Sequence, residues 1–558
     1  MLPIDEIASK LGLEKQDYTC YGDHVAKINI GTLPDRRIQK TKSHLINVTA
    51  ITPSMKGVGK TTVTIGLLDA LSKLNVKTTA AIRQSSLGPT FNLKGSGIGG
   101  GKSRCLPRDL LTLGLTGDMD RVTHAQNLAM VAASARYIHE KHDTNEQLQE
   151  KGLKRLSLDW SSLSQNWAID LCAQSLRQID SEINATLKLR SNFVMTAASE
   201  VMSILTLSKD LKDLRKKIGQ MVIAKSSNTT STNQNKWITT EDLNVAGAMS
   251  ALLINAFKPN LVQTLEGNPI LIHSGPFANI SIGQSSVIAD RIGLSLCDYH
   301  ITESGFGADI GYEKFWNIKC RQANMHPSAV VLVATIDTIK AHANCNISQE
   351  KHKIRSGFAN LLHHINIIKL SNINPIVCIN IHEHDSDKDI LLLQKLCKEN
   401  STTAVASRHF TNGSEGALEL AETVLKEVKT IKEKPFKYLY PTNLGIKEKV
   451  LVIAQKIYGA NKVCFSDQAE RQLQANCNFA IDDYNLCTAK TPYSLTHNPH
   501  LGALPQPFTL DVNNLIFHHG ARIAIPVCGD LKLMPGTGSL PSFRKIDIDP
   551  IAGDIIGL

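Results

Sequence analysis

The chain has 558 residues, of which 42% are hydrophobic and 20% are charged, a composition that excludes a disordered protein and predicts a globular protein of several domains. The formal net charge of +10 suits anionic ligands, but no dense tract of Lys and Arg indicates a nucleic-acid partner. No run of about 18 apolar residues occurs, so we expect no membrane-spanning helix.

The N-terminal segment, MLPIDEIASKLGLEKQD, carries Asp5 and Glu6 where a signal peptide would be basic and then apolar. The twelve cysteines are scattered, with no Cys-x-x-Cys pair and no zinc-like spacing. We therefore expect reduced thiols and a cytoplasmic protein.

Apolar, strand-like runs alternate with helical stretches along the whole chain. This alternation predicts an α/β fold, in which a mostly parallel sheet is flanked by helices, with smaller α/β and irregular C-terminal domains. We place the domains at 1–365, 366–505 and 506–558. The strand-like runs are 45–51, 77–83, 269–275, 329–336, 374–381 and 402–407.

The run 51–67, ITPSMKGVGKTTVTIGL, follows the first of these strands and leads into a helical pattern. A strand, a Gly-rich turn, a Lys-Thr pair and a helix form the layout of a phosphate-binding loop, although Ser54 stands where the usual motif has Gly. The layout predicts a P-loop NTPase-like fold, with Lys60 on the β- and γ-phosphates and the Thr61 hydroxyl on Mg²⁺. The expected ATP-binding residues are Ser54, Met55, Lys56, Gly57, Val58, Gly59, Lys60 and Thr61.

The stretch 82–101, IRQSSLGPTFNLKGSGIGGG, indicates a second anion site. Arg83 follows a strand and should project beside the first loop, where ligands gather in open parallel sheets. A glycine-rich surface loop without a ligand is the alternative interpretation. The glycines that would form a backbone nest are Gly95, Gly97, Gly99, Gly100 and Gly101.

Three later segments have simpler interpretations. Ser199–Leu214 has the pattern of one helix, and the polar stretch 225–237, KSSNTTSTNQNKW, is typical of a surface loop. Residues 499–558 are rich in Pro, Gly and Asn, and we expect irregular structure around short strands there.

These motifs resemble those of the formate–tetrahydrofolate ligases, which show T-P-x-x-x-G-x-G-K-T-T and then R-[EQ]-P-S-x-G-P-x-F-G-x-K-G-G-A-A-G-G-G. The family's loop also lacks the first Gly, so Ser54 does not count against the resemblance. The resemblance extends over nearly the whole chain through LTGD (115–118), AASEVMSIL (197–205), KPNLVQTLEG (258–267), GPFANI (275–280), TESGFGADIGYEKFWNIKCR (302–321), AKTPYSL (489–495) and MPG (534–536).

The resemblance implies that ATP, formate and tetrahydrofolate give 10-formyltetrahydrofolate, ADP and phosphate by way of formyl phosphate. It assigns the transferred phosphoryl group to Lys60 and the formate to Arg83. It also implies a homotetramer and a monovalent-cation requirement. Asp118 is a candidate partner of Mg²⁺ beside Thr61, and a helix N-cap is its equally weighted alternative.

The folate and formyl-phosphate pocket implied by the family contains two aromatic faces that hold the pterin. Here Phe410 stands where the family usually has Trp, and His382 where it has Phe; Gly114, Asp120 and Ile282 replace family histidines. We expect an active ligase, with two alternatives: a homologue that binds ATP but has impaired folate chemistry, and a P-loop nucleotide switch or scaffold. The pocket residues are Glu303, Gly305, Phe306, Gly307, Asp309, His382, Asp385 and Phe410.

Overall fold

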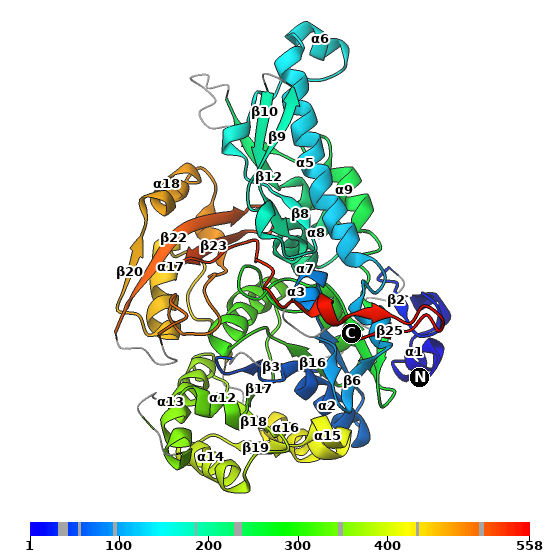
Figure 1. Ribbon diagram of the computed structural model, residues 1–558, viewed down its shortest axis with the longest axis vertical. Helices are drawn as coiled ribbons and strands as arrows, with labels where there is room; N and C mark the ends of the chain where they lie inside the picture. Colours follow the sequence, from blue (N-terminus) through cyan, green and yellow to red (C-terminus); the bar gives the residue numbers. More distant parts are fainter. Residues whose placement is uncertain are drawn as a thin grey trace.

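The computed structural model describes residues 1–31, 43–53, 57–92, 97–184, 187–227, 237–343, 347, 350–430, 435–501 and 507–558. The chain forms a mixed α/β structure around one large sheet, with a second layered region beside it (Figure 1). None of the helices in these ranges combines the length and the apolar character that crossing a membrane requires.

The large sheet has 12 strands, and its central part is parallel, as the alternating pattern predicts. From β15 to β19 every neighbouring pair is parallel. All six apolar runs form strands of this part. Its order is β15 (Pro269–Ile272), β4 (Thr78–Ile82), β16 (Tyr299–Glu303), β3 (His44–Ala50), β17 (Ala329–Ala334), β18 (Ile376–Asn380) and β19 (Ala404–Ser407).

Antiparallel strands extend this sheet beyond β15. The parallel strands are buried on both faces, so they are almost uniformly apolar rather than alternating in polarity. The added strands are β1 (Tyr18–Cys20), β2 (Ala26–Ile28), β14 (Asn260–Thr264), β5 (Gly99–Gly100) and β6 (Ser103–Leu106), and α1 (Ile4–Lys10) contacts β14 and β15.

Helices cover both faces of the sheet. α2 (Lys60–Lys73) contacts β3, β4 and β16 and packs against α16 (Leu418–Thr430). The chain crosses from β3 to β4 in the opposite direction along the sheet from its crossovers through α10, α13 and α14, so the right-handed rule puts these three helices on the face opposite α2. The remaining helices of this region are α3 (Leu87–Asn92), α4 (Arg108–Thr112), α10 (Val287–Leu296), α11 (Cys320–Ala323), α12 (Ile336–Ala341), α13 (Glu350–Lys369), α14 (Asp387–Glu399) and α15 (His409–Asn412).

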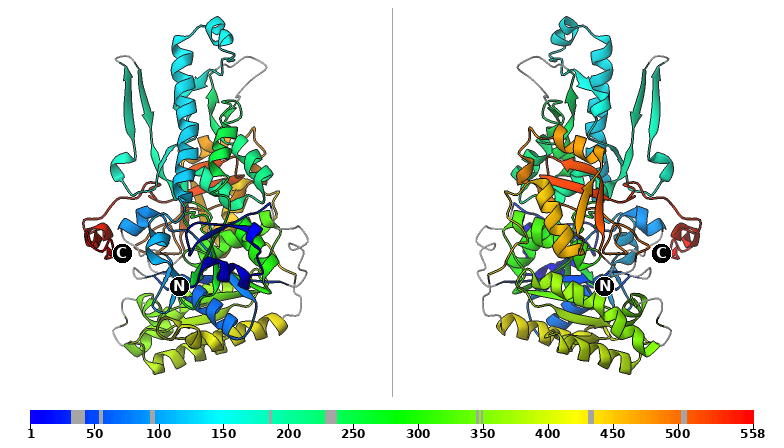
Figure 2. Two further views of the ribbon diagram at one scale, coloured as in Figure 1. Left: turned by 90° about the vertical axis from the view of Figure 1, so that its right-hand side faces the viewer. Right: turned by 90° about the vertical axis from the view of Figure 1, so that its left-hand side faces the viewer.

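A second region rises along the long helix α5 (Asp118–His142), next to which the hairpin of β9 and β10 projects (Figure 2). The buried side of α5 carries Met119, Val122, Ala125, Ala129 and Ala133, the spacing of an amphipathic helix. The region also contains α6 (Asn145–Glu150), α7 (Glu200–Leu207), α8 (Leu211–Gly219), α9 (Ala246–Leu253), β7 (Leu158–Asp159), β8 (Trp167–Ile169), β9 (Ile179–Asn184), β10 (Leu187–Ser191), β11 (Phe193–Met195), β12 (Val222–Ser226) and β13 (Trp237–Thr239).

The C-terminal part contains a four-stranded sheet with the order β20-β22-β23-β21. β22 spans ten residues and β23 six, longer than the short strands that the sequence indicates, while the stretch after β23 has only two-residue strands and irregular structure, as expected. The elements are α17 (Ile446–Ile453), β20 (Lys462–Phe465), α18 (Asp467–Ala475), β21 (Asn485–Leu486), β22 (Thr509–His518), β23 (Ile523–Cys528), β24 (Asp547–Ile548) and β25 (Ile555–Ile556).

The prediction of a single helix at Ser199–Leu214 is wrong, because two helices, α7 and α8, occupy this stretch. The chain leaves the helical conformation at Ser208 and starts a second helix after Asp210, whose side chain accepts a hydrogen bond from the Asp213 backbone N–H. This N-cap is worth about 1 kcal/mol and defines the start of α8. The loop predicted at 225–237 joins β12 to β13, with Lys225 paired to Trp237, while 228–236 lies outside the described residues.

The large sheet continues across the predicted domain boundary at 365/366. β18 and β19 follow that boundary in the sequence, yet β18 pairs with β17, which precedes it. The division of the chain into 1–365, 366–505 and 506–558 therefore stays a prediction, and hydrogen bonds of one sheet join its first two parts.

Candidate active site

A cavity of about 210 Å³ opens at the carboxyl edge of the parallel strands. This is the edge where open α/β sheets bind ligands, because the loops that leave neighbouring strands converge there. The residues around it come from loops far apart in the sequence: Pro53, Gly57, Lys60, Arg83, Gln84, Ser85, Ser86, Pro89, Thr90, Gly97, Ala197, Gly275, Pro276, Phe277, Ala278, Glu303, Phe306 and Tyr493.

The loop before α2 has the backbone of a tight, Gly-dependent turn. Gly57 and Gly59 adopt φ values of 75° and 76°, and α2 begins directly afterwards at Lys60. A Cβ on Gly59 would lie 2.4 Å from Nδ2 of Asn380, which donates to the Val58 carbonyl at 3.2 Å. Ser54, Met55 and Lys56 lie outside the described residues, so their predicted contacts with ATP are not examined by this structure.

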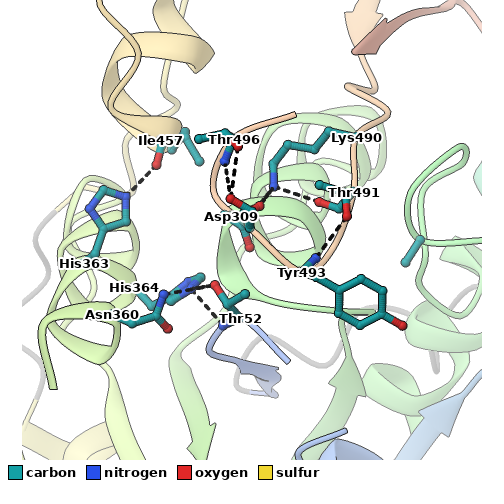
Figure 3. A network of polar contacts seen from close by, with 12 residues as sticks. Thr52, Asp309, Asn360, His363, His364, Ile457, Lys490, Thr491, Tyr493 and Thr496 are labelled. Atoms are coloured by element: carbon teal, nitrogen blue, oxygen red, sulfur yellow. Dashed lines mark hydrogen bonds and ion pairs between the residues drawn. The ribbon is translucent and has the colours of Figure 1, made fainter. Parts of the chain in front are cut away.

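The start of this loop is fixed by two buried side chains of α13 and by His342, the residue that follows α12. The backbone N–H of Thr52 donates to Nε2 of His364 at 2.9 Å, and Asn360 donates to the Thr52 hydroxyl at 3.1 Å (Figure 3). Burial lowers the pKa of His364 to about 3, so the ring is neutral and Nε2 can accept. His342 donates to the Thr52 carbonyl at 2.7 Å. Nothing in the sequence around Asn360, His364 and His342 indicates that these residues hold the start of the loop.

Glu303, at the carboxyl end of β16, joins the two predicted anion sites. Its Oε2 accepts a hydrogen bond from the Thr61 hydroxyl at 2.7 Å, and its Oε1 lies 3.6 Å from Nε of Arg83. The Glu303 side chain is only 3% exposed, whereas that of Arg83 is 27% exposed. Lys60, Arg83 and Glu303 therefore meet on one cavity, and the proximity of Arg83 to the loop of Lys60 is the one that the sequence predicts.

Another part of the cavity wall is built from the loop after β15 and the segment after β16. Phe306 lines the cavity with φ of 57°, a conformation that is a genuine outlier for a bulky side chain. Gly305 allows the close packing behind it, because an added Cβ would lie 2.4 Å from Cβ of Ala278. Strain of this kind persists where the surroundings impose it, and it concentrates at binding sites.

Lys314 holds the loop after β15 by three hydrogen bonds to its backbone. Its fully buried Nζ donates to the carbonyl oxygens of Ala278 at 2.7 Å, Asn279 at 2.9 Å and Ser281 at 3.0 Å. Burial lowers the pKa of Lys314. No sequence pattern marks this lysine as a site residue, since its partners are backbone atoms.

Asp309 is fully buried, and it acts on the cavity through a second buried lysine. Its Oδ2 lies 2.8 Å from Nζ of Lys490, which also donates to the carbonyl of Thr491 at 3.1 Å and to that of Ser494 at 2.6 Å (Figure 3). These bonds shape the turn that presents Tyr493, 40% exposed, at the cavity. Neither Lys490 nor Tyr493 was predicted as a site residue. Gly307 packs beside the pair, and an added Cβ there would lie 2.5 Å from Oδ1 of Asp309.

The predicted pterin-side residues follow the next two strands of the sheet. β18 and β19 are aligned so that Asn380 pairs with Ser407, which places His382 and Phe410 beyond neighbouring strand ends. Asp385 accepts a hydrogen bond from the His382 backbone N–H at 2.8 Å, and its side chain is 1% exposed. None of these three side chains lines the cavity itself.

Phe410 rests on the described part of the second glycine-rich loop. A Cβ on Gly100 would lie 3.1 Å from a ring atom of Phe410, and Lys102 donates its backbone N–H to the Phe410 carbonyl at 2.8 Å. Phe410 is 48% exposed, which leaves ring surface open beside α2. Gly97, Gly99 and Gly101 of the predicted nest are described with φ between 58° and 88°, and Gly95 lies outside the described residues.

Asp118 has a different environment from the one that a Mg²⁺ site requires. Its Oδ1 pairs with the buried Nζ of Lys27 at 2.7 Å, and its Oδ2 accepts from Asn260 at 2.7 Å. The N-cap of α5 is Gly117, so the N-cap alternative does not hold either. These partners favour a structural ion pair that fastens α5 to β2 and β14.

The comparisons with known proteins agree with this architecture. The family model described as formate–tetrahydrofolate ligase matches residues 1–558. The formate–tetrahydrofolate ligase of Desulforapulum autotrophicum is 42% identical over 578 residues, covering 100% of this chain and 96% of the relative. Those of Dehalococcoides mccartyi and Thermodesulfovibrio yellowstonii are 43% and 42% identical, covering 100% of this chain and 94% and 97% of the relatives. The family model and these relatives show that the chain, on whose cavity Lys60 and Arg83 meet, belongs to the formate–tetrahydrofolate ligase family.

Proposed function

We propose that this chain uses ATP to ligate formate to tetrahydrofolate, giving 10-formyltetrahydrofolate, ADP and phosphate. The observation that carries the proposal is the meeting of Lys60 and Arg83, cations from two separate loops, on one cavity with Glu303. Phosphoryl transfer needs little covalent help from a protein. It needs positioned cations around the group that moves.

The reaction divides into two displacements. A formate oxygen attacks the γ-phosphorus of ATP and the bond to ADP breaks, which gives formyl phosphate. N10 of tetrahydrofolate then attacks the formyl carbon, phosphate leaves with the shared electron pair, and N10 loses its proton. We assign Lys60 to the charge of the transferred phosphoryl group. We assign Arg83 to formate and then formyl phosphate, because its planar fork matches an oxyanion.

The oxygen donors at the cavity fit Mg²⁺, which prefers hard oxygen ligands and keeps several waters. Thr61 would hold the ion through its hydroxyl and Glu303 through its carboxylate, since these two groups already lie 2.7 Å apart. When bound, Mg²⁺ neutralises charge on the phosphates of ATP. Asp118 does not fit, because Lys27 and Asn260 occupy both of its oxygens.

We place the pterin of tetrahydrofolate near Phe410, His382 and Asp385, beyond the ends of β18 and β19. The half-exposed ring of Phe410 supports this placement, as does the short distance along the sheet from these strands to the phosphate loop. Because Phe offers less area than Trp and His less than Phe, we expect weaker tetrahydrofolate binding than in a relative with both aromatic residues.

The family also leads us to propose a homotetramer, activation by a monovalent cation and a cytoplasmic location. The cysteines of the described residues are all free, which suits a reducing compartment. Light scattering at several protein concentrations tests the tetramer, and a comparison of K⁺ with a bulky organic cation tests the activation.

The direct experiment incubates the purified chain with ATP, Mg²⁺, formate and tetrahydrofolate, acidifies the mixture and reads the absorbance of the methenyl derivative. We expect a product that requires all three substrates. Absence of product, with tetrahydrofolate binding confirmed, would refute the proposal. Formate-dependent release of ADP without a folate product would instead identify a homologue in which only the first displacement survives, the outcome that the substitutions at His382 and Phe410 would explain.

A further inference from the structure

A second group of ligand atoms lies at the same edge of the sheet, outside the cavity. One atom each from Asp337, His382 and His384 lies within 4.8 Å of the other two. Oδ2 of Asp337 is 3.1 Å from Nε2 of His384 and 3.9 Å from Nδ1 of His382. Asp337 follows β17 and the histidines follow β18, so neighbouring parallel strands bring the three side chains together.

The carboxylate of this group is held in place by its helix. Asp337 lies in the first turn of α12, where the side chain of Thr335 accepts from the backbone N–H of Thr338 at 3.1 Å. An ion pair of 2.8 Å between Lys340 and Asp389 joins α12 to α14, the helix that follows the histidines. These contacts hold the backbone that carries Asp337 against the helix that follows the histidine turn.

The histidine turn is fixed by a buried carboxylate. Oδ2 of Asp385 accepts the backbone N–H of His382, while Oδ1, which is buried and forms no hydrogen bond, lies 4.0 Å from Nε2 of His384. Among the described residues, the ion pairs of Asp337 are with these two histidines. Two carboxylates thus face a pair of imidazoles at a position where a cation would offset their charge.

The donor set selects a class of cation. Imidazole nitrogens bind Zn²⁺, Co²⁺ and Ni²⁺ well, whereas Mg²⁺ and Ca²⁺ prefer oxygen alone. Ligand bonds of about 2.0–2.2 Å in a tetrahedral site separate the donor atoms by roughly 3.4 Å. The pair of Asp337 and His384, at 3.1 Å, is already close to that spacing, and the other two pairs lie within 4.8 Å. An ordinary surface hydrogen bond would join Asp337 to one imidazole. It would not explain why a second imidazole lies within 3.9 Å of the same carboxylate oxygen.

We propose that Asp337, His382 and His384 bind one borderline divalent cation per chain, of which Zn²⁺ is the representative. The three side chains are 36%, 39% and 63% exposed, so water can complete the coordination. The ion would join α12 to the turn after β18, one strand away from the strand that leads into the phosphate loop. The inference rests on these side chains alone and holds whether or not the chain is an active ligase.

Calorimetry without ATP or folate tests it. The intact chain is first stripped with a chelator and then titrated with ZnCl₂, and the Co²⁺ form is examined for the absorption bands of a nitrogen- and oxygen-ligated ion. We expect one ion per chain and a raised melting temperature. His384→Ala and Asp337→Asn should each weaken binding by at least about tenfold, since even the loss of an outer partner of a metal ligand costs 10- to 100-fold.

The matched control is Glu383→Gln, which removes an exposed acidic charge from the same turn and leaves all three ligands in place. It should bind Zn²⁺ as the parent does. Saturable binding that survives both His384→Ala and Asp337→Asn would overturn the inference. Weak binding that never saturates in the parent would overturn it equally.

Discussion

The Thr61 hydroxyl donates to Glu303 at 2.7 Å, which ties the first turn of α2 to the carboxyl end of β16. The other oxygen of Glu303 lies 3.6 Å from Arg83, so one buried carboxylate links the first turn of α2 to the strand end that carries Arg83. Reacting groups must be placed within a few tenths of an ångström for phosphoryl transfer, and an anchor on a central strand provides that placement.

Replacing Lys60 with Ala should abolish ATP turnover without unfolding the protein. Loss of one positioned charge stabiliser typically costs about 10²–10³ in rate, and Lys60 lines the cavity at the first residue of α2. Release of ADP measures the effect and circular dichroism checks the fold. Lys73→Ala, an exposed lysine at the far end of the same helix, is the control and should turn over normally. Unchanged turnover in Lys60→Ala would refute the assignment of the phosphate loop.

Arg83→Ala should remove formate-dependent chemistry and spare nucleotide binding. Arg83 belongs to a different loop from Lys60, and it should contact the small anion rather than the adenosine. Arg83→Lys keeps the charge and loses the planar fork, so we expect it to regain only part of the activity. Calorimetry gives the ATP affinity, and initial rates give the KM for formate. The assignment is wrong if ATP affinity collapses while the KM for formate stays normal.

Phe410→Trp combined with His382→Phe should tighten tetrahydrofolate binding and leave ATP binding unchanged. Each aromatic contact is worth roughly 0.5–1.5 kcal/mol beyond burial. At about 1.4 kcal/mol per decade, the pair should change the folate dissociation constant by about ten- to a hundredfold. Calorimetry on the parent and the double variant decides the matter. Equal folate affinities would show that the pterin lies elsewhere.

Lys490→Met should destabilise the protein by about 3–5 kcal/mol, because it leaves the carboxylate of Asp309 buried without its partner. Adding Asp309→Asn should recover part of that loss. Urea unfolding of the parent, the single variants and the double variant measures the coupling. If the stability lost in the double variant equals the sum of the losses in the two single variants, the pair is not coupled in the way that its 2.8 Å separation indicates.

The sequence predicts the strands of the sheet and the residues beside Gly-rich turns well. It predicts poorly the side chains whose partners lie far away along the chain. All six apolar runs form parallel strands, because burial on both faces requires continuous apolar sequence. Lys60 and Arg83 lie where a strand-loop-helix pattern and a strand end place them.

The supporting residues were harder to predict for a physical reason. Lys314 binds backbone carbonyls, and Lys490 pairs with Asp309 across a long stretch of chain, so no local periodicity marks either residue. The break after α7 was missed because an apolar helical pattern continues through Ser208, while the capping by Asp210 depends on one side-chain hydrogen bond. The ion pair of Asp118 has no local signal either, since its partner Lys27 lies on a distant strand.

Transfer of an oxygen isotope tests the central claim most directly. If formate attacks the γ-phosphorus, the oxygen that forms the new bond leaves with phosphate when N10 displaces it. Turnover with ATP, tetrahydrofolate and ¹⁸O-labelled formate should therefore give phosphate that carries one labelled oxygen, read by mass spectrometry. Unlabelled phosphate, formed together with 10-formyltetrahydrofolate, would contradict the formyl phosphate route.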